Sequence, residues 1–374
     1  MSQDEKAPFL PYGRQIIDDD DIAAVVRVLR SDWLTTGPNV ERFEADVCAF
    51  TGANHGVAVC NGTAALHAAV HALGIGPGDE VVVPPMTFAA SANCVLYCGA
   101  TPVFADVDAG TLLLDPAAAE AAITPRTRAI IAVDYAGQPC DWDALRALAD
   151  RHGLALVADA CHSIGGTDKG RKVGTLADVT VFSFHPVKHV TTGEGGMCLT
   201  DDAELAHRMR TFRNHGITTD ARQREKAGGW FYEMTDLGFN YRITDIQCAL
   251  GSSQLGKLPG WLARRRELAA AYDAALTGSS ARPLARRADT EHAYHLYVVR
   301  HPVRDEAFKR LRGNGVGANV HYVPVHLHPY YRERLGTHEG LCPAAEAAYR
   351  EILSLPLWPG MSRTDVGRVA RLLD

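Results

Sequence analysis

The chain has 374 residues, of which 47% are hydrophobic, 22% charged and 7% aromatic. This composition is typical of a globular protein and excludes wholesale disorder, and the length predicts one large and one smaller domain. With 38 Lys+Arg against 44 Asp+Glu, the net charge of −6 argues against proteins that bind nucleic acid or anionic membranes through basic patches.

No apolar run approaches the roughly 18–20 residues of a membrane span. The first residues, MSQDEKAPFLPYG, place acids where a signal peptide needs a basic and then a long apolar stretch. The nine cysteines are scattered and form no C-x-x-C pair, so we expect reduced, mostly buried and inert thiols. These features predict a cytoplasmic protein that does not contact a membrane.

From about residue 56, short apolar runs alternate with helix-like segments. Each run is rich in Val or Ile or ends at Gly, Pro or Asp, and the pattern predicts βαβ units with a mostly parallel sheet covered by helices. The predicted strands are 57–60, 80–85, 102–107, 129–135, 154–160, 179–184 and 195–200. The predicted helices between and after them are 63–73, 88–98, 141–152, 201–214, 244–257 and 261–277.

Pro259-Gly260 predicts a break between the last two helices, and therefore a domain boundary. We expect an N-terminal segment and a large α/β domain over 1–258, and a small α+β domain over 259–374. The basic triplet 264–266 lies on the second helix, where we expect it to be a solvated face.

A lysine and three aspartates carry the first chemical prediction. Asp106, Asp134 and Asp159 each end a predicted strand, and ligands of open α/β sheets bind at the carboxyl ends of strands. Lys188 follows the strand 179–184 among apolar residues and glycines. Desolvation there would lower the pKa of its amine and favour the neutral nucleophile that Schiff-base chemistry requires.

Two glycine-containing segments do not match the nucleotide-binding motifs that their glycine spacing suggests. The sequence GEGGMC at 193–198 lacks the third glycine of a dinucleotide-binding turn and precedes a strand, and Arg171-Lys172 replaces the Lys-Ser/Thr of a P-loop. The turn NGTAAL at 61–66 is the better anion site, because its free N–H groups begin a helix. Together with Lys188 and Asp159, this turn indicates a pyridoxal phosphate site.

The chain resembles the DegT/DnrJ/EryC1/StrS family of sugar aminotransferases over nearly its whole length. The resemblance rests on LTTGPNVERFE (34–44), NGTAAL (61–66), PPMTFAASAN (84–93), VDYAGQP (133–139), DACHSIGG (159–166), FSFHPVKHVTTGEGG (182–196), LGFNYRITDIQCALG (237–251) and NVHYVPVHLHPYY (319–331). It implies a fold-type I aminotransferase: a large domain with a mostly parallel seven-stranded sheet covered by helices, and a smaller C-terminal α+β domain.

The resemblance also implies roles, residue by residue. Lys188 would bond to the aldehyde of pyridoxal 5'-phosphate and move the proton, with Asp159 on the ring nitrogen and His162 near the ring hydroxyl. The remaining cofactor-binding residues would be Gly62, Thr63, Phe88, Ser183 and, from the neighbouring subunit, Asn240. The residues facing the nucleotide sugar would be Tyr12, Asp32, Trp33, Leu34, Thr35, Val320, His321, Tyr322 and Val323.

The blocks PYGRQ, SDWLTTG and FHPVKHVTTGEGG are most similar to members of the pseudaminic acid pathway. They imply amination at C4 of a UDP-linked 4-keto-6-deoxy-N-acetylhexosamine of the L-altrosamine type. L-Glutamate would be the donor, 2-oxoglutarate its product, and the enzyme a homodimer with shared active sites. The exact sugar, the nucleotide (UDP, dTDP or GDP), the position (C3 or C4) and the stereochemistry of the new amine stay open.

Three alternatives follow from the same residues. The first is a sugar dehydratase, because some relatives with that activity have His in place of the lysine and His189 adjoins Lys188 here. The second is a non-catalytic regulator of the same fold, although no basic domain supports it. His321, His326 and His328 could place two imidazoles on one strand face, but no carboxylate or cysteine adjoins them in sequence. We therefore expect no metal site.

Overall fold

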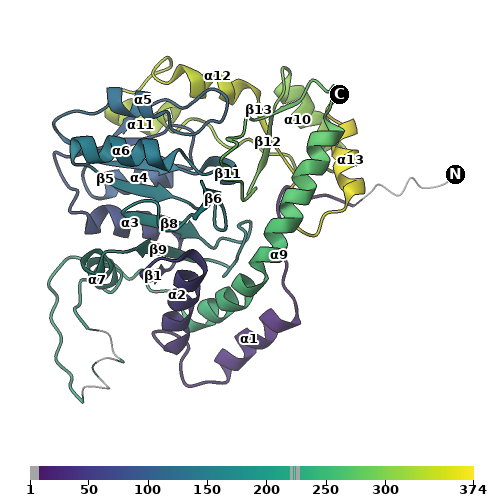
Figure 1. The fold of residues 1–374 in the computed structure, drawn as a ribbon. Coiled ribbons are helices and arrows are strands. Elements are labelled where there is room, and N and C mark those ends of the chain that lie inside the picture. The colour runs from purple at the N-terminus through teal and green to yellow at the C-terminus, as the bar shows by residue number, and fades with distance from the viewer. Residues whose placement is uncertain (1–7, 220–221, 223, 225–227) are drawn as a thin grey trace.

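A computed structural model describes residues 8–219, 222, 224 and 228–374. Its centre is a seven-stranded sheet in the order β1-β9-β8-β5-β4-β2-β3 (Figure 1). The strands are β1 (His55–Val59), β2 (Glu80–Val83), β3 (Thr101–Phe104), β4 (Thr127–Val133), β5 (Ala155–Asp159), β8 (Val179–Ser183) and β9 (Gly196–Thr200). Only β9 runs antiparallel to its neighbours within this sheet. The predicted fold class and the mainly parallel sheet are confirmed.

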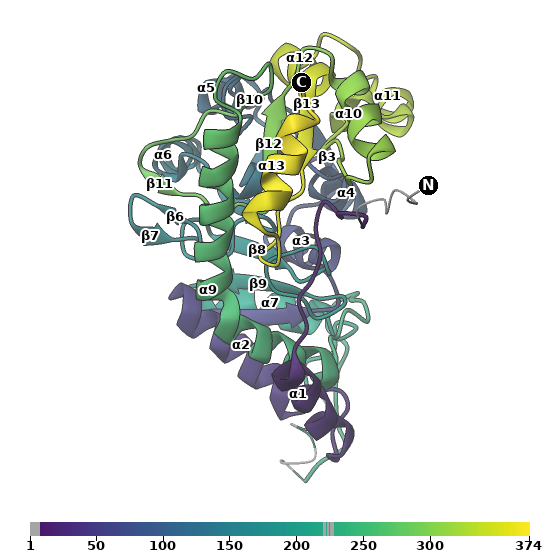
Figure 2. The same ribbon diagram turned by 90° about the vertical axis from the view of Figure 1, so that its right-hand side faces the viewer.

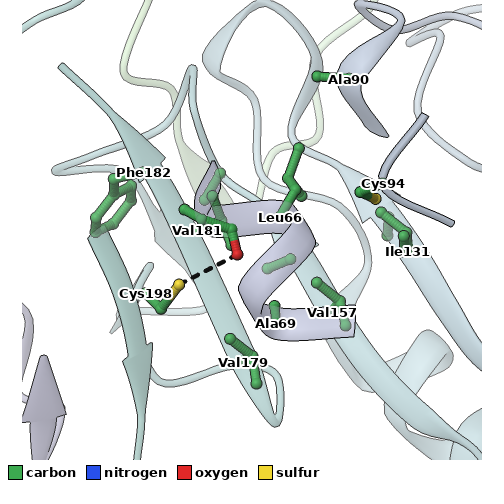
Figure 3. Close-up of a cluster of buried hydrophobic side chains, with 14 of the residues drawn as sticks. Leu66, Ala69, Ala90, Cys94, Ile131, Val157, Val179, Val181, Phe182 and Cys198 are labelled. Atoms are coloured by element: carbon green, nitrogen blue, oxygen red, sulfur yellow. Dashed lines mark hydrogen bonds between the residues drawn. The ribbon is translucent and has the colours of Figure 1, made fainter. Parts of the chain in front are cut away.

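Helices cover the sheet because their apolar positions are buried against it. They are α2 (Pro38–Thr51), α3 (Gly62–Ala72), α4 (Ala90–Tyr97), α5 (Pro116–Ala121), α6 (Trp142–His152) and α7 (Ala203–Phe212). The helix α1 (Asp19–Leu29) packs instead on the long helix Asp245–Ala275, where Ala24 and Val28 form a separate small cluster with Ala249. In α3 nearly every side chain is buried, as expected of a helix that is apolar all round. Figure 3 shows Leu66 and Ala69 of this helix against Val179 and Val181 of β8, with Cys198 donating to a helix carbonyl.

The C-terminal part is the expected mixture of helices and strands. Its helices are α10 (Arg304–Gly313), α11 (Pro329–Leu335), α12 (Pro343–Glu351) and α13 (Arg363–Arg371), with 3-10 turns at η1 (Tyr135–Gly137) in the large sheet region and at η2 (Val325–Leu327). Its antiparallel sheet contains β10 (Arg282–Pro283), β12 (Tyr297–Arg300) and β13 (Ile352–Leu355). A further small sheet joins β11 (Thr290–Glu291) to β6 (Thr167–Asp168) and β7 (Arg171–Lys172).

The predicted break at Pro259-Gly260 is wrong. One helix, α9 (Asp245–Ala275), runs through both residues and connects α1 and α2 at one end with α13 at the other (Figures 1 and 2). A proline inside a helix costs about 3 kcal/mol, but this helix is held by packing on both sides of it. Leu258 and Leu262 belong to the core of the large sheet, while Leu268 belongs to a second core in the C-terminal part.

The predicted division between 258 and 259 therefore falls inside a continuous helix and stays a prediction. The N-terminal segment also contacts the part of the chain beyond this division. Leu10 belongs to the second core, and its backbone forms hydrogen bonds with Gly315 and Gly317. The expectation for the basic triplet is wrong at Arg265, which is buried and donates to the carbonyls of Tyr294 (3.0 Å) and Leu357 (2.9 Å). Burial lowers the pKa of this guanidinium to about 10.

Within the described ranges, none of the helices is long and apolar enough to cross a bilayer. All nine cysteines lie in these ranges as free thiols, five of them buried.

Candidate functional site

A cavity of about 580 Å³ opens at the carboxyl ends of the parallel strands, between the large sheet and the C-terminal segment 319–322. The predicted site residues that line it are Tyr12, Gly62, Thr63, Phe88, Asp159, His162, Ser183, Lys188, Val320, His321 and Tyr322. These residues come from distant parts of the chain and meet because strand ends, helix starts and one crossing segment converge there. The topology thus brings the predicted lysine, aspartate and anion-binding turn into one cavity.

Asp159 is the last residue of β5 and is 6% exposed. Its Oδ2 accepts a hydrogen bond from the Ser91 hydroxyl at 2.6 Å, and its Oδ1 accepts one from the Cys161 N–H at 3.3 Å. Two donors hold the carboxylate at the cavity wall and leave acceptor capacity for a ligand N–H. This arrangement fits a carboxylate that pairs with a pyridinium nitrogen.

The other two strand-end aspartates serve the scaffold. Asp134 accepts from the Ser163 hydroxyl (2.6 Å) and from the Cys140 N–H (2.8 Å), and burial raises its pKa to about 7. Asp106 accepts from the two N–H groups at the start of α12. Of the three, only Asp159 lines the cavity.

Lys188 lies in the loop between β8 and β9, where its N–H donates to the His185 carbonyl at 2.8 Å. Burial in the cavity wall lowers the pKa of its amine, and the nearby Cys161 and Asp159 oppose that shift. A lowered amine pKa increases the neutral fraction at neutral pH, which is the form that attacks an aldehyde. The predicted desolvation of this lysine is therefore present.

The turn before α3 provides an anion cradle. Asn61 caps the helix by accepting from the Ala64 N–H at 2.8 Å, so the N–H groups at the very start of the helix stay available. A Cβ on Gly62 would lie 3.0 Å from Ser183 Cβ and 3.4 Å from Cys161 Sγ. Glycine at this position therefore keeps open the space between the helix start and the Ser183 hydroxyl, as a bound phosphate requires.

Three buried histidines surround the lysine. The His162 and His295 rings lie 4.4 Å apart, His295 and His189 lie 5.7 Å apart, and His162 Nε2 is 3.2 Å from the Tyr322 hydroxyl. Burial, followed by the charge of Lys188, lowers the pKa of His162 and His295 well below the usual value. The imidazoles of His162 and His295 therefore stay neutral at neutral pH.

The C-terminal segment contributes only part of what was expected. Val320, His321 and Tyr322 line the cavity, and Val323 does not. His321 Nδ1 is 2.9 Å from the Ser354 hydroxyl, and the Tyr12 and His321 rings lie 5.4 Å apart. Tyr12 therefore lies beside this segment, and a sugar-facing role for the two stays a prediction.

The three histidines that could have shared one strand face do not do so, because His326 lies in η2 and His328 at the start of α11. His326 lies in the 3-10 turn η2 and pairs at 2.8 Å with Glu346 of α12, a carboxylate that the local sequence does not place beside it. Glu346 also accepts from the N–H groups of Gly340 and Cys342, so this buried pair anchors a loop. No group of three potential metal ligands occurs in the ranges that the structure covers.

Besides Val323, five predicted residues do not line this cavity: Asp32, Trp33, Leu34, Thr35 and Asn240. All except the half-buried Trp33 are exposed. The two segments approach each other, because Thr35 bridges Thr244 and the Asp245 N–H donates to the Leu34 carbonyl at 3.0 Å. A role for them in a neighbouring subunit's cavity stays a prediction.

Asn61 and Leu66 of the cavity belong to the predicted anion-binding turn 61–66. The cavity residues that the sequence did not predict are Thr87, Ala90, Val133, Cys161, His185, Val187, Glu194, His295 and Asn319. Thr87 and the Asp159 partner Ser91 stand four residues apart at the start of a helix, a spacing that could have suggested paired hydroxyls. His295 precedes a strand in a different part of the chain, and nothing in its local sequence indicates that it faces His162.

The chain is similar to known proteins over nearly its whole length. The model of the DegT/DnrJ/EryC1/StrS aminotransferase family matches residues 15–374. The spore coat polysaccharide biosynthesis protein SpsC of Bacillus subtilis (strain 168) is 44% identical over 371 residues, which are 96% of this chain and 95% of that protein.

Solved structures superpose closely. Spr1654 from Streptococcus pneumoniae, described as a sugar aminotransferase, is 34% identical in its PMP form, with a TM-score of 0.93 over 97% of this chain and 98% of that one. The same protein is solved in a PLP form. Helicobacter pylori PseC, an aminotransferase involved in pseudaminic acid biosynthesis, is 31% identical, with a TM-score of 0.91 over 98% of both chains.

Proposed function

Because this chain belongs to the DegT/DnrJ/EryC1/StrS aminotransferase family, a family of PLP-dependent sugar aminotransferases, we propose that it moves the amino group of L-glutamate to a nucleotide-linked keto-sugar. The specific acceptor proposed is a UDP-linked 4-keto-6-deoxy-N-acetylhexosamine of the L-altrosamine type, aminated at C4. The observation that carries the proposal is the presence of Lys188, Asp159 and the α3 anion cradle in one cavity.

Bound pyridoxal phosphate supplies the carbonyl that holds the amino group between the two half-reactions and withdraws electrons from the reacting carbon. Lys188 would bond to its aldehyde and would carry the proton to and from the reacting carbon, because the lowered pKa of its amine favours the neutral form that acts as a base. Asp159 would accept the ring N–H and stabilise the positive charge of the ring.

The remaining cavity residues bind and orient. The N–H groups at the start of α3, with the Ser183 hydroxyl, would donate to the phosphate, and His162 would reach the ring hydroxyl from its place beside Tyr322. Phe88 is 61% exposed at the cavity and would stack on the ring. Tyr12 and the segment 320–323 would face the sugar.

We further propose a homodimer in which Asn240 and the segment 32–35 complete the partner's site. These residues do not line their own chain's cavity, and Asn240 directly follows a segment with many exposed apolar side chains. They are Trp230, Phe231, Tyr232, Met234, Leu237 and Phe239. Large apolar side chains exposed close together along a chain are typical of a surface that a partner covers.

The alternative to this proposal is an aminotransferase that acts on another nucleotide-linked keto-sugar. Similarity to PseC supports a pseudaminic acid intermediate, whereas the higher identity to SpsC favours another sugar of a surface polysaccharide. The test is a panel of UDP-, dTDP- and GDP-linked 3- and 4-keto-sugars, each incubated with glutamate, with product structures determined by NMR. We expect the UDP-linked 4-keto-6-deoxy-L-altrosamine derivative to react fastest. Faster turnover of a dTDP or GDP sugar, or amination at C3, would replace the specific assignment with the alternative.

A further inference from the structure

A line of three hydrogen-bonded side chains lies behind the cavity at Asp159. The Thr87 and Ser91 hydroxyl oxygens are 2.7 Å apart, and the Ser91 hydroxyl is 2.6 Å from Asp159 Oδ2. Thr87 is 2% exposed, Ser91 is fully buried and Asp159 is 6% exposed. Thr87 also lines the cavity, so the line begins and ends at its wall.

The number of available protons determines which group donates in each of these hydrogen bonds. An ionised carboxylate only accepts, and a hydroxyl has a single proton to donate. Ser91 must therefore give its proton to Asp159, and Thr87 must give its own proton to Ser91. The Phe88 carbonyl lies 3.3 Å from the Ser91 oxygen and competes weakly for the same proton, because hydrogen bonds to a charged acceptor are shorter and stronger.

These three hydrogen-bonded side chains connect two elements that contribute different residues to the proposed cofactor site. Thr87 and Phe88 form the turn that leads into α4, while Asp159 ends β5. The same turn is fixed by backbone bonds, since the Ser91 N–H donates to the Phe88 carbonyl at 3.2 Å. The orientation of the carboxylate is thereby tied to the position of the side chain proposed to stack on the ring.

The bond at Asp159 Oδ2 also decides what the other oxygen can do. Oδ1 receives only the longer bond from the Cys161 N–H, at 3.3 Å. With Oδ2 occupied by Ser91, the carboxylate cannot turn freely, and Oδ1 keeps room for a strong acceptor contact. A buried carboxylate that lost its Ser91 donor would be both less well solvated and free to rotate.

We infer that Ser91 and Thr87 are positioning residues of the transamination site: Thr87 orients the Ser91 hydroxyl, and Ser91 holds the Asp159 carboxylate aimed at the cofactor ring. The inference rests on the proposed function, in particular on Asp159 as the partner of the ring nitrogen. It predicts that the two hydroxyls act in series, so that Thr87 works only through Ser91.

A double-mutant cycle tests the series arrangement. Ser91→Ala removes the donor to the carboxylate, and we expect kcat for the glutamate half-reaction to fall about ten- to a hundredfold, as loss of a hydrogen bond to a charged group predicts, with the glutamate KM unchanged within about twofold. Thr87→Val, which keeps the side-chain shape, should reduce kcat by about three- to tenfold. In the Ser91→Ala background, Thr87→Val should have no further effect.

Two readouts do not depend on turnover. The pH midpoint of the bound cofactor's visible absorbance should shift in Ser91→Ala, and the apo protein should bind pyridoxamine phosphate more weakly. Thr180→Val is the matched control, because Thr180 is a fully buried threonine on β8 whose hydroxyl has no hydrogen-bond partner among the described residues. It removes the same group outside the cavity and should leave kcat, spectrum and cofactor binding as in the wild type.

Asp159→Asn separates failure of the inference from failure of the proposed function. If Asp159→Asn is inactive while Ser91→Ala keeps the wild-type kcat and spectrum, the inference is overturned and the function stands. Additive effects of the two hydroxyl variants also overturn the series arrangement. If Asp159→Asn itself retains full activity, the role of Asp159 fails and the inference fails with it.

Discussion

At the scale of single residues, the lysine and the aspartate of the site could be predicted from the sequence, whereas the side chains that contact them could not. Lys188 and Asp159 were predicted from their place after strands, and both line the cavity. Asp134 had the same sequence context as Asp159, and only the fold separates them, because Asp134 is bonded to Ser163 and turned into the scaffold. The Ser91 hydroxyl contacts Asp159, and the His295 ring contacts His162, only because the fold brings together residues that are far apart in sequence. The sequence pattern carries no information on such contacts.

Lys188→Ala is expected to abolish transamination, because no other amine lines the cavity within the described residues. We expect less than about one per cent of the wild-type kcat, a barrier increase of more than roughly 2.7 kcal/mol. The variant should still bind pyridoxal phosphate noncovalently through the anion cradle. Single-turnover kinetics with glutamate measures the loss, and a kcat above that level would contradict the assignment of the lysine.

Gly62→Ala is expected to fill the anion cradle. The added Cβ would lie 3.0 Å from Ser183 Cβ, so either the helix start or β8 must shift. Overpacking of this size costs about 1–3 kcal/mol, and we expect cofactor affinity to fall about ten- to a hundredfold.

Equilibrium dialysis of the apo protein measures the cofactor affinity of this variant. Gly256→Ala is the control, since Gly256 lies on the exposed side of α9 and a Cβ there meets nothing within 4 Å. Equal affinities for the two variants would show that Gly62 does not face the phosphate.

At the scale of elements, the strands of the large sheet were the most predictable, because each is a short apolar run, largely buried, between turn residues. The error at Pro259 has a tertiary cause. Pro259 was expected to end a helix, yet packing at Leu258 and Leu262 continues α9 through it. Tertiary contact also decides the place of His326, which its spacing could have put on a strand and which lies in the turn η2 beside Glu346 of α12.

Pro259→Ala is expected to stabilise the protein. Pro259 is exposed inside α9, where it lacks an N–H and leaves a carbonyl of the preceding turn without its helical partner. Restoring that bond should raise the free energy of unfolding by about 1–3 kcal/mol. Urea unfolding followed by circular dichroism measures the change, with Gly256→Ala as a second helix-favouring substitution on the same helix. A lower stability of Pro259→Ala would mean that the helix needs the proline's geometry.

At the scale of the whole molecule, the dimer prediction concerns how many chains build one site. If Asn240 reaches the partner's phosphate, Lys188→Ala and Asn240→Asp disable complementary halves of the site, the second by placing a carboxylate against a phosphate dianion. Refolding the two inactive variants together at equal concentration should make about half of the dimers mixed. Each mixed dimer has one intact site, so activity should return to about one quarter of wild type.

Mass spectrometry of the intact dimers verifies that mixed dimers form. If they form while activity stays at the level of the parents, Asn240 acts within its own chain or not at all. The exposed apolar stretch at 228–239 would then belong to a different interface.

The central claim is that this cavity exchanges an amino group with glutamate through Lys188. The measurement that tests it most directly is the visible spectrum of the purified protein loaded with pyridoxal phosphate and then mixed with L-glutamate, with 2-oxoglutarate assayed in the same sample. We predict that the absorbance of the bound cofactor disappears, that the pyridoxamine form accumulates and that one 2-oxoglutarate is released for each cofactor converted. An unchanged spectrum with glutamate and with every other amino donor would contradict the claim.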